Sequence, residues 1–170
     1  MIHLVLPFIF VSTTWFAAFA EPKDKCQHDE KTFRCVKVLR VYDGDTIYVD
    51  IPDTHPLFGK NMPVRIRGID TPEIRTRDHK CEKPRGLEAK KYLEGLVRSA
   101  KSIELRNIGR PKYFRVLADL YLDREPVSRK LIDRGLAYEY HGKTKQKIDW
   151  CRTKRVPASN KKPTKKIDHN

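Results

Sequence analysis

The segment RIRGIDTPE, residues 65–73, decides the fold of this chain and the placement of its charged groups. Its first part is strand-like, with apolar residues between polar ones. Arg65 lies in the strand, and Asp70 and Glu73 follow where the strand ends. Pro72 fixes its own backbone angle and favours an extended residue before it, so both carboxylates are expected at a strand exit rather than on a helix. A guanidinium beside two carboxylates could bind a phosphate and a cation together.

A hairpin is predicted upstream of this segment. The Asp-Gly pair at 43–44 separates two β-rich runs, 36–42 and 46–51. Such a pair indicates a tight hairpin because glycine accepts positive φ. Asp45 then lies at the mouth of the second strand. A third strand is expected over 62–69, after a proline-rich connection.

Two helices and two more strands are predicted downstream. After Pro84, apolar residues recur three and four positions apart, as on one face of a three- to four-turn helix; they are Ala89, Tyr92, Leu93, Leu96, Val97 and Ala100. Strands are expected at 102–106 and 114–122. A short helix at 129–134 follows, with Ser128 as N-cap and Gly135 just past its end.

This order of elements is typical of an oligonucleotide/oligosaccharide-binding (OB) barrel. The predicted fold class is α+β, mainly β: a five-stranded OB barrel with one helix between strands 3 and 4 and a short C-terminal helix. The folded part of about 130 residues is enough for one core and too short for a second domain.

The chain divides into three parts. Residues 1–20 are almost wholly apolar and end in Ala-Phe-Ala, which predicts a secretory signal peptide; an uncleaved membrane anchor is the alternative. Residues 21–151 form the domain, and 152–170 are a basic tail expected to be disordered. The domain is therefore expected outside the cytoplasm, secreted or periplasmic.

Charge and cysteines narrow the class of protein further. The formal net charge is +14, from 36 Lys and Arg against 22 Asp and Glu, which favours nucleic acid, anionic lipid or cell-wall polymers as partners. Four cysteines in an exported chain suggest two disulfides, with three possible pairings. We favour Cys26 with Cys35 and Cys81 with Cys151. Zinc is the competing interpretation, but no C-x2-C pair or suitably spaced His supports it.

Three linked motifs resemble the staphylococcal nuclease (thermonuclease) family. They are DGDT at 43–46, R-x4-DTPE at 65–73 and KYxR at 112–115, and the similarity runs from about residue 36 to 138. The resemblance implies an OB fold and a secreted, Ca2+-dependent endonuclease, a hydrolase of phosphodiester bonds in DNA, with RNA as a further substrate. The long helix that ends the family's type member is largely absent here, and a Cys81–Cys151 disulfide is expected to replace its clamping role.

The resemblance also assigns roles at the site, which agree with the chemistry of the residues. Hard oxygen donors suit Ca2+, and the candidates are Asp45, Asp70 and the carbonyl of Thr71. Planar bidentate donors suit phosphate, and the candidates are Arg65 and Arg115. Glu73 is the candidate to orient or deprotonate the attacking water. Tyr113 matches a tyrosine near the nucleotide, and Phe114 stands where the type member has Gly.

Two other classes of protein remain as alternatives. One is a non-catalytic nucleic-acid-binding OB-fold protein of the same family, and the other is a cationic surface or wall-binding protein dominated by its tail. Carboxylates facing phosphate would disfavour binding alone, so their presence favours the enzyme. His79 and His141 are interpreted as solvated, and the basic stretch 72–84 as either a flap beside the acidic cluster or a solvated loop. We expect nucleic acid as partner, no obligate protein partner and a monomer.

Overall fold

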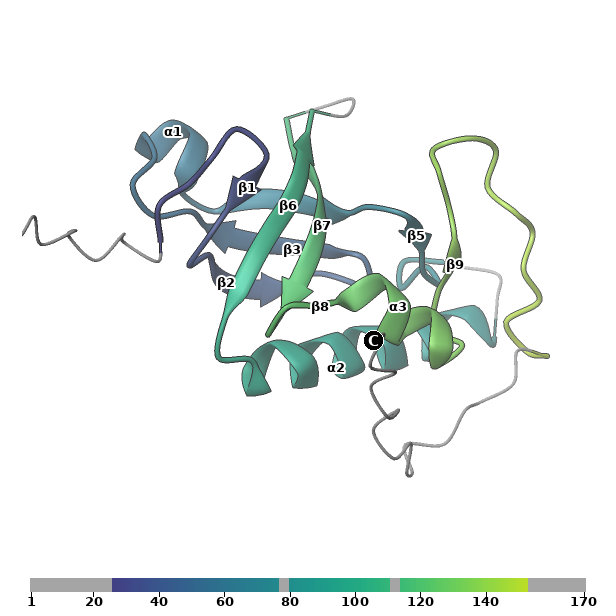
Figure 1. Ribbon diagram of the computed structural model, residues 1–170. Coiled ribbons are helices and arrows are strands. Elements are labelled where there is room, and N and C mark those ends of the chain that lie inside the picture. The colour runs from purple at the N-terminus through teal and green to yellow at the C-terminus, as the bar shows by residue number, and fades with distance from the viewer. Residues whose placement is uncertain (1–25, 77–79, 111–113, 153–170) are drawn as a thin grey trace, which may run out of the picture.

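The computed structural model describes residues 26–76, 80–110 and 114–152 (Figure 1). The predicted signal peptide, nearly all of the predicted tail, and the side chains of Tyr113 and His79 lie outside these ranges. Within them, no helix has the length and apolar character needed to span a membrane.

Five strands of the main sheet have the topology of an OB barrel. Their order is β6-β7-β4-β3-β2, with β4 and β7 parallel and the other neighbours antiparallel. The outer strands β2 and β6 approach each other where Val36 N donates to Ile103 O, 3.2 Å away. The predicted fold is thus confirmed; the strands are β2 (Lys37–Val41), β3 (Thr46–Asp50), β4 (Met62–Ile66), β6 (Ile103–Gly109) and β7 (Val116–Leu122).

The third strand is shorter than predicted. It ends at Ile66, and the chain turns at Gly68, whose φ of 80° glycine adopts without strain. A separate strand β5 (Ile69–Asp70) then pairs with β9 (Tyr138–Glu139) rather than with the main sheet. This break carries Asp70 away from β4 and toward the C-terminal part of the domain.

Short elements that the sequence pattern did not reveal complete the fold. β1 (Thr32–Phe33) pairs with β6, and β8 (Glu125–Pro126) pairs with β7. A single helical turn, α1 (Pro56–Gly59), lies in the connection between β3 and β4.

Two longer helices cover one end of the sheet (Figure 1). Helix α2 (Glu82–Ser99) begins before Pro84, not after it, because the first turn of a helix tolerates proline. Its residues Ala89 and Leu93 are fully buried in the core, as the apolar stripe predicts.

The short helix α3 (Val127–Asp133) begins differently from the prediction. Pro126 is its N-cap and no side chain caps it, so the proposed role of Ser128 is wrong. Gly135 does end the helix, with φ 68°, and Leu136 N donates to Leu131 O at 2.9 Å. These are features of a Schellman motif, which satisfies the last carbonyl groups of the helix.

Gly44 is required in the hairpin for a reason other than its turn. It is not among the residues with positive φ. A Cβ at this position would lie 2.8 Å from Ala89 Cβ and 2.9 Å from Thr71 Cβ. The hairpin therefore packs directly on α2 and on the segment that follows Asp70, and this close approach places Asp45 beside Thr71.

Gly44→Ala is expected to lower the free energy of unfolding by about 1–3 kcal/mol, the usual effect of overpacking a tight contact. Gly95→Ala is the control, because Gly95 is an exposed position of α2 with open space around it. It should stabilise by up to about 1 kcal/mol through helix propensity. Urea unfolding of both variants measures the contrast, and equal free energies would show that the packing at Gly44 is unimportant.

Two disulfides join the predicted cysteine pairs, Cys26–Cys35 and Cys81–Cys151. The second connects the N-terminus of α2 to the segment after β9, across 70 residues of sequence. No helix follows β9 in the described residues, so this disulfide is the covalent link that holds the C-terminal segment near the site.

Candidate functional site

Arg65 joins the acidic residues of two motifs, DGDT at 43–46 and R-x4-DTPE at 65–73, in space. It lies in β4 opposite Thr46 of β3, so its side chain emerges next to the hairpin that carries Asp45. One guanidinium nitrogen is 2.7 Å from Asp45 Oδ1, and the other is 2.8 Å from Asp70 Oδ1. Only 12% of the Arg65 side chain is exposed. The structure thus brings the predicted site residues Asp45 and Asp70 together around the largely covered guanidinium of Arg65.

Asp45 is the most constrained carboxylate of the group. Its Oδ2 accepts hydrogen bonds from the backbone N and the Oγ1 of Thr71, at 3.0 and 2.9 Å. Its Oδ1 accepts from Thr46 Oγ1 at 3.1 Å. Thr71, predicted as a carbonyl ligand, therefore also fixes Asp45 through its amide and hydroxyl. Burial raises the pKa of Asp45 to about 7, against the lowering effect of Arg65. Additional positive charge nearby would favour its ionised form.

Asp70 is held by groups from the C-terminal part of the domain. Tyr138 donates its hydroxyl to Asp70 Oδ2 at 2.8 Å. Burial, followed by this hydrogen bond, raises the pKa of Tyr138 to about 12, so the hydroxyl remains a donor at neutral pH. Lys145 Nζ is 3.2 Å from Asp70 Oδ1. The β5–β9 pairing thus supplies Tyr138, and the segment after β9 supplies Lys145, so both partners of Asp70 lie far away in sequence.

Glu73 lies at the edge of the cluster and is more open to solvent. Its side chain is 55% exposed, and its Oε1 is 2.9 Å from Lys145 Nζ. Burial lowers the pKa of Lys145, but its bonds to Glu73 and Asp70 outweigh this effect and raise it. Lys145 is therefore a fixed positive charge that bridges Asp70 and Glu73.

Arg115 directly precedes β7 and approaches the site from a different element than Arg65. Within the described part of the chain its side chain makes no ion pair or hydrogen bond, and its Nε is buried without a partner. It lines a hollow of about 550 Å³ together with Arg65, Arg67, Tyr140 and His141. An unpaired guanidinium next to a paired one is available to bind an anion.

The structure thus assembles Asp45, Asp70, Thr71, Arg65 and Glu73 and places Arg115 on the same hollow as Arg65, whereas Tyr113 lies outside the described residues. Sequence reasoning missed Tyr138, Tyr140 and Lys145. They belong to no motif that we recognised. The one available signal was the predicted Cys81–Cys151 bridge, which brings the C-terminal segment toward the acidic motif.

The donor set fits a hard cation. Asp45 and Asp70 offer carboxylate oxygens that share one guanidinium, and burial leaves the charge of Asp45 incompletely compensated. Among the described residues no group of three or more His, Cys, Asp or Glu forms a complete cage. A cation held here would accept carbonyl, water or phosphate oxygens as well, which Ca2+ does readily.

Comparison with known proteins places the chain in a family. The family model described as Staphylococcal nuclease homologue matches residues 63–163. Endonuclease YncB of Bacillus subtilis is 35% identical over 149 residues, which are 84% of this chain and 67% of YncB. Thermonuclease of Staphylococcus hyicus is 34% identical over 110 residues, 64% of this chain and 59% of that protein. The chain thus spans about two thirds or less of the length of these relatives. It belongs to the staphylococcal nuclease family.

Proposed function

We propose that this protein is a secreted or periplasmic, Ca2+-dependent nuclease that hydrolyses phosphodiester bonds of DNA, and of RNA as a second substrate. One observation carries the proposal: Arg65 binds both Asp45 and Asp70, while Arg115, whose side chain has no partner among the described residues, lines the same hollow as Arg65. Asp45 and Asp70 do not line this hollow themselves, but their ion pairs with Arg65 place the carboxylates for a cation next to the guanidinium groups for a phosphate.

Arg115 and Arg65 divide the binding of the phosphate in this proposal. Arg115 has no partner to give up within the described residues, so it contacts the phosphate directly. Arg65 is already bonded to both aspartates and therefore also fixes their positions. Planar guanidinium groups offer paired hydrogen bonds to phosphate oxygens, and these strengthen as negative charge develops in the transition state.

Asp45, Asp70 and the carbonyl of Thr71 would hold the Ca2+. Such an ion would neutralise charge on the phosphate oxygens as the bond to water forms. Thr71 and Thr46 keep the carboxylate of Asp45 oriented, and Tyr138 does the same for Asp70. The protein thus supplies an oriented pair of anionic oxygens and leaves the remaining ligand positions to small molecules and substrate.

Glu73 is the proposed general base or orienting group for water. It is the only one of the three acidic side chains that is not bonded to Arg65, and it is the most exposed. Water can therefore reach it. Lys145 binds one of its oxygens, and the other has no partner in the part of the chain that the structure describes, so it can accept a hydrogen bond from the attacking water.

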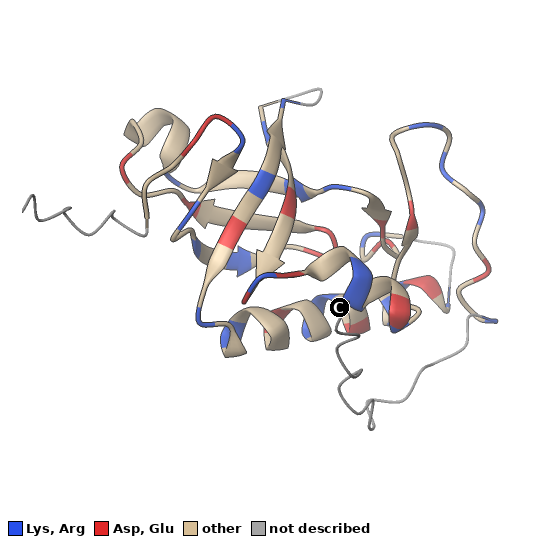
Figure 2. Ribbon diagram, viewed as in Figure 1, with Lys and Arg blue, Asp and Glu red and all other residues tan. Residues whose placement is uncertain are grey.

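Other features support an exported enzyme that acts on nucleic acid. YncB and thermonuclease carry nuclease names, although the chain covers only part of each. Lys and Arg occur on the segment after β9, on α2 and on β6 (Figure 2), and the net charge is +14. Two disulfides are typical of an oxidising compartment. We further propose that the enzyme acts as a monomer without an obligate protein partner.

Incubation of the mature chain with single-stranded DNA, duplex DNA and RNA tests this function. In the presence of Ca2+ we expect the protein to shorten DNA with multiple turnovers. We expect it to shorten RNA as well, and the assay measures the rate. A non-catalytic nucleic-acid-binding protein would instead shift the mobility of the nucleic acid without shortening it. Stable binding with no cleavage of any substrate would overturn the proposal.

Arg115→Lys is expected to lower the cleavage rate by about 10²–10³-fold, the usual effect of losing one stabilising donor of the transition state. The charge stays, but the paired geometry toward phosphate is lost. Arg98→Lys is the control, since Arg98 is exposed on α2 and does not line the hollow. Initial rates at saturating DNA measure both variants. A rate for Arg115→Lys within a factor of three of the parent would exclude this role.

A further inference from the structure

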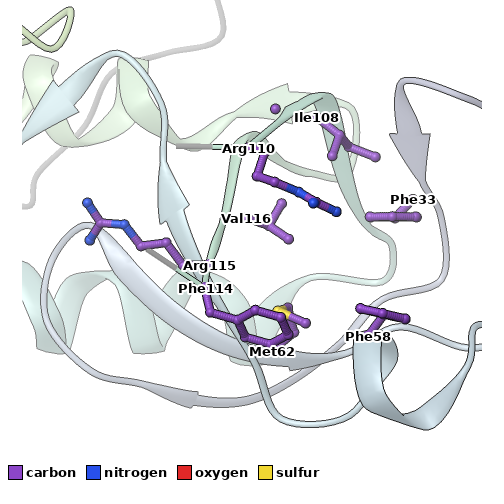
Figure 3. A pocket seen from close by; sticks show the side chains of 9 residues that line it. Phe33, Phe58, Met62, Ile108, Arg110, Phe114, Arg115 and Val116 are labelled. Carbon is purple, nitrogen blue, oxygen red and sulfur yellow. The ribbon is translucent and has the colours of Figure 1, made fainter. Parts of the chain in front are cut away.

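A second cavity, of about 320 Å³, also has Arg115 in its lining (Figure 3). It is outside the acidic cluster, and Phe114 and Phe58 form part of its wall. Their rings are 6.5 Å apart and tilted by 38°. In Figure 3, the ring of Phe114 lies in front of Met62, Arg110 extends toward Phe33, and the guanidinium of Arg115 points away from the other lining side chains.

The two phenylalanines are unusually exposed for their size. Phe114 is 66% and Phe58 is 51% exposed, although buried apolar residues such as Met62 lie beneath them. Each exposed ring loses hydrophobic stabilisation that a buried ring would gain. Contiguous exposed aromatic surface beside a cavity is characteristic of a ligand site.

The surroundings of the cavity favour one kind of occupant. Phe114 directly precedes Arg115, the proposed phosphate ligand, so the cavity lies next to the proposed phosphate site. Arg110 adds a second guanidinium at the rim. Within the described residues no Asp or Glu lines this cavity. Aromatic rings combined with cationic groups along a path of phosphates are the elements that bind unpaired bases.

We infer that this cavity is a stacking subsite for an unpaired base of the substrate strand, next to the phosphate held at Arg115. The inference rests on the proposed function for the position of that phosphate. A base in a duplex is covered by its neighbours and cannot enter, so the subsite favours single-stranded DNA or RNA. The rings of Phe114 and Phe58 provide the stacking surface, and Arg110 contacts the adjacent phosphate.

The test compares two oligonucleotides that share their phosphates. One is a fluorescein-labelled oligothymidylate of about eight nucleotides, a typical site size, and the other is its abasic counterpart. Anisotropy in EDTA gives the ratio of the two dissociation constants without cleavage. This ratio, abasic strand over oligothymidylate, is the preference for bases. We expect the Phe58→Ala, Phe114→Ala double variant to reduce it by about 10–100-fold, the effect of losing one stacked base. Its affinity for the abasic strand should stay the same.

Leu57→Ala is the matched control, because Leu57 is 63% exposed on α1 next to Phe58 but does not line the cavity. It should retain the parental preference, and the melting temperatures of all variants report whether they fold. An unchanged preference in the double variant would overturn the inference, as would a parent that does not distinguish the two strands. If the parent prefers the strand with bases, loses this preference in the double variant and yet never cleaves DNA, the proposed function is wrong and the stacking subsite stands.

Discussion

Glu73→Gln should cleave DNA about 10²–10⁴-fold more slowly than the parent while it still binds Ca2+ and a nucleotide. Glutamine has nearly the same shape as glutamate but cannot accept a proton at neutral pH. Asp45 and Asp70, which are bonded to Arg65 and are the proposed ligands of the cation, should remain in place. If Glu73 acts on water as proposed, its replacement should therefore lower the rate and leave binding intact.

Calorimetry of Ca2+ and of a non-cleavable nucleotide, combined with initial rates, separates the two effects. Glu139→Gln is the control, since Glu139 is exposed on β9 and has no role in the proposed site. Asp45→Ala should differ from Glu73→Gln in Ca2+ binding, with a raised Ca2+ requirement as well as a lower rate. If Glu73→Gln abolished Ca2+ binding, or cleaved at nearly the parental rate, the assignment of Glu73 would be wrong.

Replacement of both Cys81 and Cys151 by Ser should lower the free energy of unfolding by about 4 kcal/mol. In the chain-entropy model the stabilisation grows with the length of the closed loop, here 70 residues. The Cys26–Cys35 disulfide closes a loop of only nine, so its removal should cost about 2–3 kcal/mol. The two pairs therefore serve as controls for each other.

Urea unfolding without reductant measures both double variants. The Cys81–Cys151 variant should also cleave more slowly, because the released segment carries Lys145, which contacts Asp70 and Glu73. A loss below about 1 kcal/mol for the long loop, or an equal loss for the two pairs, would show that residual structure or strain dominates instead.

Local sequence patterns predicted the fold well, because the spacing of apolar residues, the turn residues and the charges of each segment indicate the same element. The hairpin before Asp45, the apolar face of α2 and the glycine after α3 follow from short-range rules. Their boundaries shifted where tertiary contacts decided them. β4 ends early because β5 pairs with β9, a partner that sequence pattern alone does not identify.

The site was predictable to the extent that its residues belong to motifs. Asp45 and Arg65 meet as expected because the register of β3 and β4 places Arg65 opposite Thr46, and Asp70 follows Arg65 closely enough in sequence for their side chains to pair. Lys145 could not be found in this way, since it lies in a segment without regular structure whose position depends on β9 and a disulfide. Gly44 was identified for its turn, whereas its contact with Ala89 depends on how α2 packs.

The most direct test of the account is the rate of DNA cleavage by the mature chain in Ca2+, then after excess EDTA, then after Ca2+ is restored. If Asp45 and Asp70 hold a catalytic cation as proposed, we expect cleavage, its loss with the chelator and its recovery to the initial rate. Circular dichroism at each step controls for unfolding. A rate that EDTA leaves unchanged, or a folded protein that never cleaves, would contradict the claim that Asp45 and Asp70 serve a cation-dependent nuclease.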